Sequence, residues 1–158
     1  MRITTRDFGE LNIDPEEIIN IPRGLFAFEE YTRFALIKDE DNPICWLQSL
    51  EEAELSFILM NPFLFKKDYE FELADEILLD LGIKDPGEVA VFVLMVIPED
   101  YKKMTANLTA PLVINTKLNR ARQIILNEKQ YSMRYRLFGE ENLSKGAEFD
   151  AGLEQKEV

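Results

Sequence analysis

Short apolar segments separated by turn residues recur along most of the chain. In several of them apolar and polar residues alternate, which is the pattern of a strand with one buried face. Residues 89–97 form an unbroken apolar run, which indicates a strand buried on both faces. The predicted strands are 1–5, 10–13, 18–21, 33–38, 44–50, 55–60, 69–73, 88–97, 104–108, 112–115 and 123–126. Short strands at near-regular spacing favour a single mostly β domain, either an antiparallel barrel or a sandwich.

Helical patterns are few. Residues 75–81 are the best candidate, with Asp75 expected as the capping residue and Gly82 as the residue that ends the helix. A single helical turn is expected over residues 29–31, and residues 131–138 are expected to form a last strand or a helical turn. The predicted fold class is therefore mostly β, with one or two short helices.

The composition divides the chain into two parts. Its 158 residues match the usual size of one domain, and 46% of them are hydrophobic, which is enough for a buried core. Residues 139–158 contain few large apolar side chains and carry a net charge of −4, which leaves −8 for residues 1–138. We expect one folded domain over 1–138, followed by an acidic, flexible C-terminal tail over 139–158.

The charge and the single cysteine restrict the partners and the compartment. A net charge of −12 repels phosphate groups, so direct binding to nucleic acid is not expected and basic partners are favoured. Cys45 lies in an apolar run, where a buried, inert thiol is expected, and one cysteine forms no internal disulfide, as is usual in a reducing compartment. The N-terminus lacks the apolar core of a signal peptide, and the longest apolar run is shorter than the roughly 20 residues of a membrane-spanning helix. We expect a cytoplasmic protein that does not bind a membrane.

The residue types that most enzymes and metal sites need are missing from the sequence. There is no histidine, the commonest general base and metal ligand, and a single cysteine cannot form a thiolate zinc site. No glycine-rich phosphate loop is present, and the acidic run at 39–42 lacks the glycine and glutamate of a calcium-binding EF-hand loop. We expect no catalytic residues, no metal and no cofactor. A hydrolase with two carboxylates remains a rival interpretation, although many acidic residues lie in turns or alternate with apolar ones, as on a solvated strand face.

Two segments place aromatic residues in loops. Residues 22–28 combine a proline, a glycine and two phenylalanines, and residues 62–69 place three aromatic residues beside lysines and an aspartate. Exposed aromatic side chains are good anchors for a partner protein, whereas the alternative is that these loops fold back and close the ends of a barrel. The residues predicted at a partner surface are Phe26, Phe28, Phe63, Phe65, Asp68, Tyr69 and Glu70. The two acidic residues of this set are expected to pair with basic residues of the partner.

A series of short motifs extends from the N-terminus to about residue 137. The motifs are Phe8-Gly9, Ile18–Glu29, Trp46–Ser49, Ser56-Phe57, Asn61-Pro62, Asp68-Tyr69, Asn107–Asn115 and Gln123–Leu126, followed by Tyr131. Each motif alone is weak, but their order and spacing resemble the FliW family of bacterial flagellar assembly factors. The chain departs in details, since Asn61 stands where an aspartate is common and residues 25–27 lack a second glycine.

The resemblance implies a mostly antiparallel, barrel-like β fold and a role in protein binding. FliW-like proteins bind flagellin and the small RNA-binding repressor CsrA, and when flagellin is secreted the freed protein captures CsrA and relieves repression of flagellin translation. The resemblance also adds Asn107 and Asn115, from the most distinctive motif, to the predicted partner-binding residues. It implies a regulator without a reaction of its own, and a general chaperone-like binder of secreted proteins is the other alternative.

Overall fold

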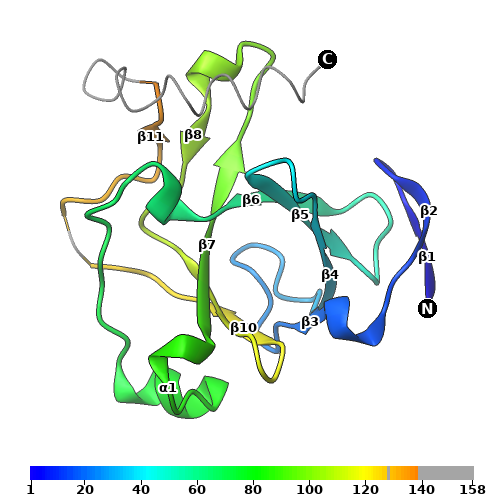
Figure 1. The fold of residues 1–158 in the computed structure, drawn as a ribbon, viewed down its shortest axis with the longest axis horizontal. Coiled ribbons are helices and arrows are strands. Elements are labelled where there is room, and N and C mark those ends of the chain that lie inside the picture. Colours follow the sequence, from blue (N-terminus) through cyan, green and yellow to red (C-terminus); the bar gives the residue numbers. More distant parts are fainter. Residues whose placement is uncertain (128, 139–158) are drawn as a thin grey trace.

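Seven strands of the computed structural model close into a barrel (Figure 1). The structure describes residues 1–127 and 129–138 of the chain. The barrel strands are β3 (Ile18–Asn20), β4 (Arg33–Lys38), β5 (Ile44–Ser49), β6 (Ser56–Met60), β7 (Val89–Val96), β9 (Leu112–Asn115) and β10 (Arg120–Gln123). Around the barrel they follow the order β7, β6, β5, β4, β3, β10, β9, and β9 pairs with β7 to close it. All of these pairings are antiparallel except the parallel pairing of β3 with β10. The prediction of a mostly β, barrel-like domain is confirmed.

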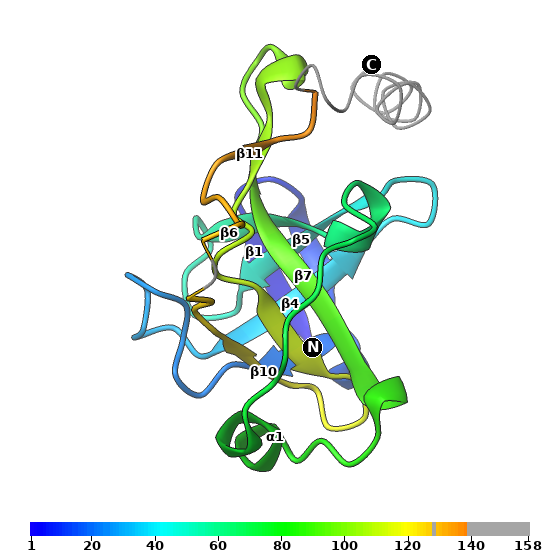
Figure 2. The ribbon, with the colours of Figure 1, turned by 90° about the vertical axis from the view of Figure 1, so that its left-hand side faces the viewer.

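Four further strands are added to this barrel. They are β1 (Arg2–Thr5), β2 (Gly9–Asn12), β8 (Thr105–Ala106) and β11 (Tyr135–Arg136). β1 and β2 form a hairpin whose Ile3 packs with Ile13 and with Ala35 of the barrel. β8 and β11 continue the sheet from the C-terminal end of β7, and Figure 2 shows this part rising above the barrel.

Helical structure in the described residues is limited to one short α-helix and four single turns of 3-10 helix. They are α1 (Asp75–Leu81), η1 (Pro15–Glu17), η2 (Pro62–Leu64), η3 (Pro86–Glu88) and η4 (Tyr101–Lys103). α1 has the predicted bounds, and Gly82 ends it with a φ of 66°. The predicted cap was wrong, because Ala74 occupies the capping position. Asp75 is the first helical residue, where its carboxylate lies near the positive end of the helix dipole.

Side chains from all seven strands fill the barrel interior. The buried or partly buried members include Ile19, Phe34, Leu47, Leu59, Phe92, Leu112 and Ala121. Leu25, in the loop after β3, belongs to the same cluster, so this loop folds back into the barrel. The other face of β7 is covered as well, since Val93 and Met95 pack with Tyr69 and Leu108. The prediction of a strand buried on both faces is met only in part, because Val89–Phe92 and Leu94 are half-buried and Val96 is exposed.

Three predicted segments differ from the structure. Residues 69–73 have the expected alternation of buried and exposed side chains, but they pair with no strand in the described part of the chain. The strand expected at 123–126 lies at Arg120–Gln123, because alternate residues of this polar segment are buried and pair with β9. Residues 29–31 form a turn without a helix.

Other predictions are met only in part or fall outside the described residues. Of the strand expected at 104–108, only two residues are in β8, and residues 131–138 contribute the two-residue strand β11. The predicted acidic tail, 139–158, lies outside the described residues. Within residues 1–127 and 129–138, no helix has the length and apolar character needed to span a membrane.

Candidate functional site

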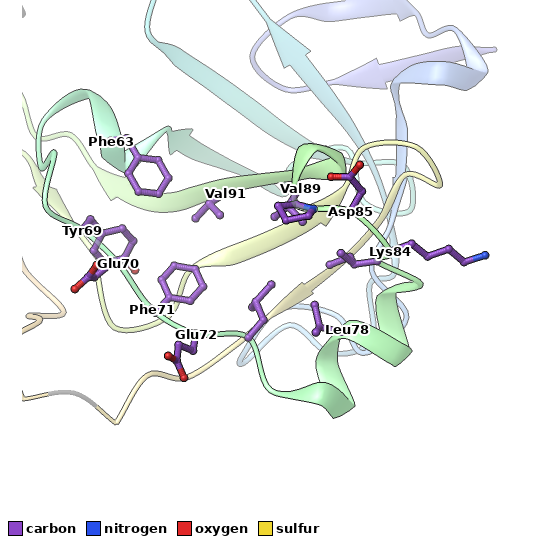
Figure 3. A pocket seen from close by; sticks show the side chains of 13 residues that line it. Phe63, Tyr69, Glu70, Phe71, Glu72, Leu78, Lys84, Asp85, Val89 and Val91 are labelled. Carbon is purple, nitrogen blue, oxygen red and sulfur yellow. The ribbon is translucent and has the colours of Figure 1, made fainter.

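A groove of about 750 Å³ lies between the extended chain 69–73, α1 and the outer face of β7, and we call it the β7 groove (Figure 3). Its apolar lining consists of Phe63, Tyr69, Phe71, Leu73, Leu78, Ile83, Pro86, Val89 and Val91. The volume lies within the range of about 300–1,000 Å³ typical of binding pockets, which are mostly apolar with a few polar groups. The β7 groove is therefore the first candidate for a binding site.

The sequence at the end of β6 explains why the groove exists. β6 stays paired with β7 as far as Met60, and Pro62 follows two residues later. Proline has no N–H to donate to a strand ladder, and it favours the first position of a helical turn. The Asn61 side chain accepts a hydrogen bond from the Phe63 N–H at 2.9 Å and so begins η2. The chain thereby leaves the barrel and returns as the outer wall of the groove.

Two tyrosines hold the outer wall in place without a strand ladder. The Tyr131 hydroxyl accepts a hydrogen bond from the Glu70 N–H at 2.9 Å and donates one to the Glu70 carbonyl at 2.7 Å. The Tyr69 hydroxyl donates to the Leu108 carbonyl at 2.7 Å, and the rings of Tyr69 and Tyr131 meet edge to face with centroids 4.8 Å apart. These contacts explain how residues 69–73 acquire the burial pattern of a strand although they join no strand in the described part of the chain.

The border of the groove is mainly acidic. Glu70, Glu72 and Asp85 are exposed beside it, and Lys84 is the one basic residue of its lining. Figure 3 shows the carboxylates of Glu70 and Glu72 at the outer wall and the Lys84 side chain extending away from the groove. An apolar groove with an acidic border complements a partner segment that carries apolar and basic side chains.

Two arginines near α1 do not neutralise the acidic border of the groove, because they form ion pairs with acidic residues of α1. Arg122 contacts Asp80 at 3.3 Å and Glu76 at 3.5 Å, and Arg23 contacts Asp80 at 3.6 Å. These pairs connect α1 with β10 and with the loop after β3. Their effect is to position the helix that forms one side of the groove.

The structure places three of the sequence-predicted residues at the β7 groove. Phe63 is 42% exposed and lies with its ring centroid 6.0 Å from that of Tyr69. Glu70 is exposed at the border. Tyr69, in contrast, is only 2% exposed, so it is a core residue that supports the wall and has almost no surface for a partner.

Phe65 and Asp68 belong to the segment 62–69 but do not line the β7 groove. The ring of Phe65 stacks on Tyr135 with centroids 5.9 Å apart, which connects the segment to β11. Asp68 accepts a hydrogen bond from the Lys66 ammonium at 3.1 Å. Both residues therefore have contacts within the protein, although Asp68 remains largely exposed.

Phe26 and Phe28 belong to a separate surface formed by the loop after β3. The Phe26 N–H donates to the Gln123 side-chain oxygen at 2.9 Å, while the Phe26 side chain is 46% exposed. Phe28 packs edge to face on Phe57 with centroids 5.1 Å apart. Between the two phenylalanines, Ala27 adopts a φ of 73°, which is unfavourable for a residue with a side chain and often marks a functional loop.

Asn107 and Asn115 make hydrogen bonds inside the protein. Asn115 is fully buried, and its side-chain amide donates to the Leu81 carbonyl at the end of α1 at 2.8 Å. The Asn107 side-chain oxygen accepts from the N–H and the hydroxyl of Thr109 at 3.1 and 2.7 Å. Their side chains stabilise a turn and a helix end. The sequence predicted contact with a partner for these residues and did not predict this structural role.

Packing and loop geometry change the pKa values of the titratable groups of Cys45 and Glu51. Burial raises the pKa of the Cys45 thiol to about 12, so the thiol is protonated at neutral pH. Backbone N–H groups of Arg33 and Thr32 donate to the Glu51 carboxylate and lower its pKa. No group of three or more histidine, cysteine, aspartate or glutamate residues within 1–127 and 129–138 is arranged to hold a metal ion.

The sequence contained no direct sign of several residues that build the groove. Leu78 and Val91 read as ordinary core positions of a helix and a strand, yet both line the groove. Tyr131 is 61 positions away from Glu70 in the chain, and no local pattern indicates that they bond. Only the apolar character of these residues and the proline after β6 were visible in advance.

Comparison with known proteins identifies relatives over nearly all of the folded chain. A family model described as FliW protein matches residues 2–137. The flagellar assembly factor FliW of Caldicellulosiruptor saccharolyticus is 42% identical over 146 residues, covering 92% of this chain and 95% of the relative. That of Alkaliphilus metalliredigens is 41% identical over 142 residues, covering 89% and 88%. A crystal structure of the flagellar assembly factor FliW matches with a TM-score of 0.83 and 33% identity, covering 89% of this chain and 99% of that chain.

Proposed function

The chain belongs to the FliW family of flagellar assembly factors, and on this basis we propose that it works by binding two proteins, flagellin and the RNA-binding repressor CsrA. In this proposal it is held by flagellin until flagellin is secreted, and it then captures CsrA and relieves repression of flagellin translation. It acts in the cytoplasm as a regulator and catalyses no reaction.

The observation that carries the proposal is the β7 groove with its acidic border. An apolar groove of about 750 Å³ offers a partner a place to bury side chains, and exposed Phe63 adds an aromatic anchor at its edge. The carboxylates around it favour a basic partner, which suits a protein that itself binds RNA phosphates. Exposed Phe26, held by an unfavourable backbone conformation at Ala27, is proposed as a second contact on the separate loop.

The proposed antagonism of CsrA has an electrostatic part. Residues 1–138 carry a net charge of −8, and this charge would lie beside the RNA-binding surface of a captured CsrA. At physiological salt such charges act over a Debye length of about 8 Å. RNA is therefore repelled even where the two binding footprints on CsrA do not overlap.

Calorimetric titration of the purified chain with purified flagellin and, separately, with purified CsrA tests the proposal. Glu70→Lys reverses a charge at the groove border, and it is expected to weaken binding of at least one partner by about tenfold or more. Glu10→Lys is the matched control. Glu10 is an exposed residue of the β1–β2 hairpin, on the opposite side of Figure 1 from α1, and its ion pair with Arg2 at 3.5 Å is solvent-exposed.

The outcomes separate the proposal from its rivals. Binding of both proteins, weakened by Glu70→Lys and unchanged by Glu10→Lys, is the expected result, with thermal unfolding used to verify that both variants fold. Absence of binding to flagellin and to CsrA would overturn the proposal. A pull-down from cell extract that recovers many unrelated secreted proteins would instead favour a general chaperone-like binder.

A further inference from the structure

Along Val89–Phe92, one edge of β7 borders the groove and has no neighbouring strand among the described residues. β6 pairs with β7 only between Met95 and Val93, whereas β9 pairs with the N-terminal half of β7 on the opposite edge. In the part of the chain that the structure describes, no strand continues the line of β6 along Val89–Phe92. The position opposite Val91 in this register belongs to Pro62, where the chain enters η2 and no longer continues as a strand.

The hydrogen-bonding pattern of β7 shows which backbone groups this edge presents. The Glu88 carbonyl accepts from the Thr116 N–H at 2.8 Å, so even-numbered residues in this half of β7 direct their backbone groups toward β9. The N–H and C=O of Val91 therefore point the other way, toward the side that β6 vacates. No hydrogen bond to either group occurs within residues 1–127 and 129–138. An unpaired edge of this kind is a template for another strand.

The side chains beside this edge are apolar. Val89 and Val91 line the groove from β7, and Phe71 faces them from the outer wall (Figure 3). Side chains of an extended peptide alternate in direction, so a strand added here would bury every second side chain in the groove. Glu70 and Glu72 of the acidic border lie on the outer wall, across the groove from β7.

We propose that the open edge of β7 binds an extended segment of a partner protein, which adds a strand opposite Val89–Val91. This inference rests on the proposed function and specifies the chemistry of the partner. The segment has alternating apolar side chains that enter the β7 groove and lysine or arginine residues that meet its acidic border. A helix in the groove would leave the N–H and C=O of Val91 without partners, because a helix uses its own backbone groups internally.

Amide hydrogen exchange followed by NMR on the full chain tests the strand directly. In the free protein, the Val91 amide should exchange faster than those of Ala90 and Phe92, which bond to β9. With saturating purified flagellin or CsrA, Val91 exchange should slow by about tenfold or more with one of them, which corresponds to a hydrogen bond of about 1.4 kcal/mol.

Each other outcome has a definite meaning. A Val91 amide that is already protected in the free chain would show that this edge of β7 is not open, and would overturn the inference. Binding of a partner with no slowing at Val91 would overturn this inference and leave the proposed function standing. Absence of binding to both proteins would overturn both.

A pair of variants provides an independent test on the same strand. Val91→Lys places a charged side chain in the apolar groove and should weaken partner binding by about tenfold or more. Val96→Lys makes the same change at the far end of β7, where the side chain is already 67% exposed, and should leave binding unchanged. Unchanged affinity in a folded Val91→Lys protein would overturn the inference. If this variant fails to fold, the exchange experiment decides.

Discussion

Gly24 shows at the scale of a single residue how tightly the loop after β3 is folded. Its φ is 65°, and a Cβ added there would lie 2.5 Å from the Glu29 Cα, closer than any side chain can approach. Gly9 has the same φ, but a Cβ added to it would meet nothing within 4 Å. A substitution at Gly9 therefore tests the backbone conformation alone, and a substitution at Gly24 tests the backbone conformation together with the close contact.

We predict that Gly24→Ala lowers the free energy of unfolding by about 3 kcal/mol or more, whereas Gly9→Ala lowers it by about 1 kcal/mol. Both alanines adopt an unfavourable left-handed conformation, but only the one at position 24 also collides with backbone. Denaturant-induced unfolding of the two variants measures the difference. Equal losses would show that the loop moves to accept the side chain.

Cys45 is the residue whose ionisation the fold changes most clearly. Burial raises the pKa of its thiol to about 12, while an unfolded thiol ionises near its ordinary value of about 8.5. The folded state therefore retains the proton over a pH range in which the unfolded state loses it. This contribution to stability is complete below the unfolded pKa and is lost as the pH rises from there toward the folded pKa.

Two measurements follow from this shift. The native protein should react with a thiol reagent far more slowly than the unfolded chain at pH 8 to 9, because the thiolate is the reactive form. Between pH 8 and 10, the free energy of unfolding should fall more steeply for the wild type than for Cys45→Ala, since other titrating groups are common to both. Parallel pH profiles would contradict the assigned burial of the thiol.

At the scale of elements, hydrogen bonds from the hydroxyls of Tyr69 and Tyr131 hold the outer wall of the β7 groove. The Tyr131 hydroxyl bonds both the N–H and the C=O of Glu70, and it replaces the ladder that residues 69–73 lack. A wall held by a few side-chain hydrogen bonds can move more readily than a paired strand, which suits a groove that must admit a partner.

Tyr131→Phe should lower the free energy of unfolding by about 1–2 kcal/mol, because it removes two hydrogen bonds and leaves the ring in place. Exchange of the Glu70 amide should become faster at the same time. Tyr135→Phe is the control, since the Tyr135 ring stacks on Phe65 and its hydroxyl makes no hydrogen bond within the described part of the chain. Similar effects of the two variants would show that the hydroxyl of Tyr131 is not what holds the wall.

At the scale of the whole molecule, residues 1–138 carry a net charge of −8, which acts over a distance set by the Debye length. The chain should reduce the affinity of CsrA for RNA by a larger factor at about 0.1 M salt than at about 1 M, because the Debye length falls from about 10 Å to about 3 Å. The ratio of RNA affinities with and without the chain is the quantity to compare, since salt weakens RNA binding in both cases. A ratio that does not change with salt would assign the antagonism to steric exclusion alone.

The sequence by itself determined the elements whose signals are local. Turn residues and alternating apolar positions located most barrel strands to within one or two residues, and the bounds of α1 were correct because Gly82 ends the helix with a conformation that glycine adopts readily. The order of short motifs also indicated the family, which the comparisons then showed. The prediction placed β10 too late in the chain, because residues 120–123 are mostly polar and show no strand pattern in the sequence. Alternate residues of this segment are buried only in the folded structure, where it pairs with β9.

Only the tertiary structure decided whether residues 69–73 join a sheet and whether the Tyr69 side chain is buried. Their alternation was real, but whether an extended segment joins a sheet depends on which backbone groups lie opposite, and here a tyrosine from a distant part of the chain lies there. Exposure is likewise a property of the assembled fold, so Tyr69 became core while Phe63, six residues earlier, stayed at the surface. The β7 groove and its open edge arise because β6 ends before Pro62 while β7 continues to pair with β9, and no local pattern contains that consequence.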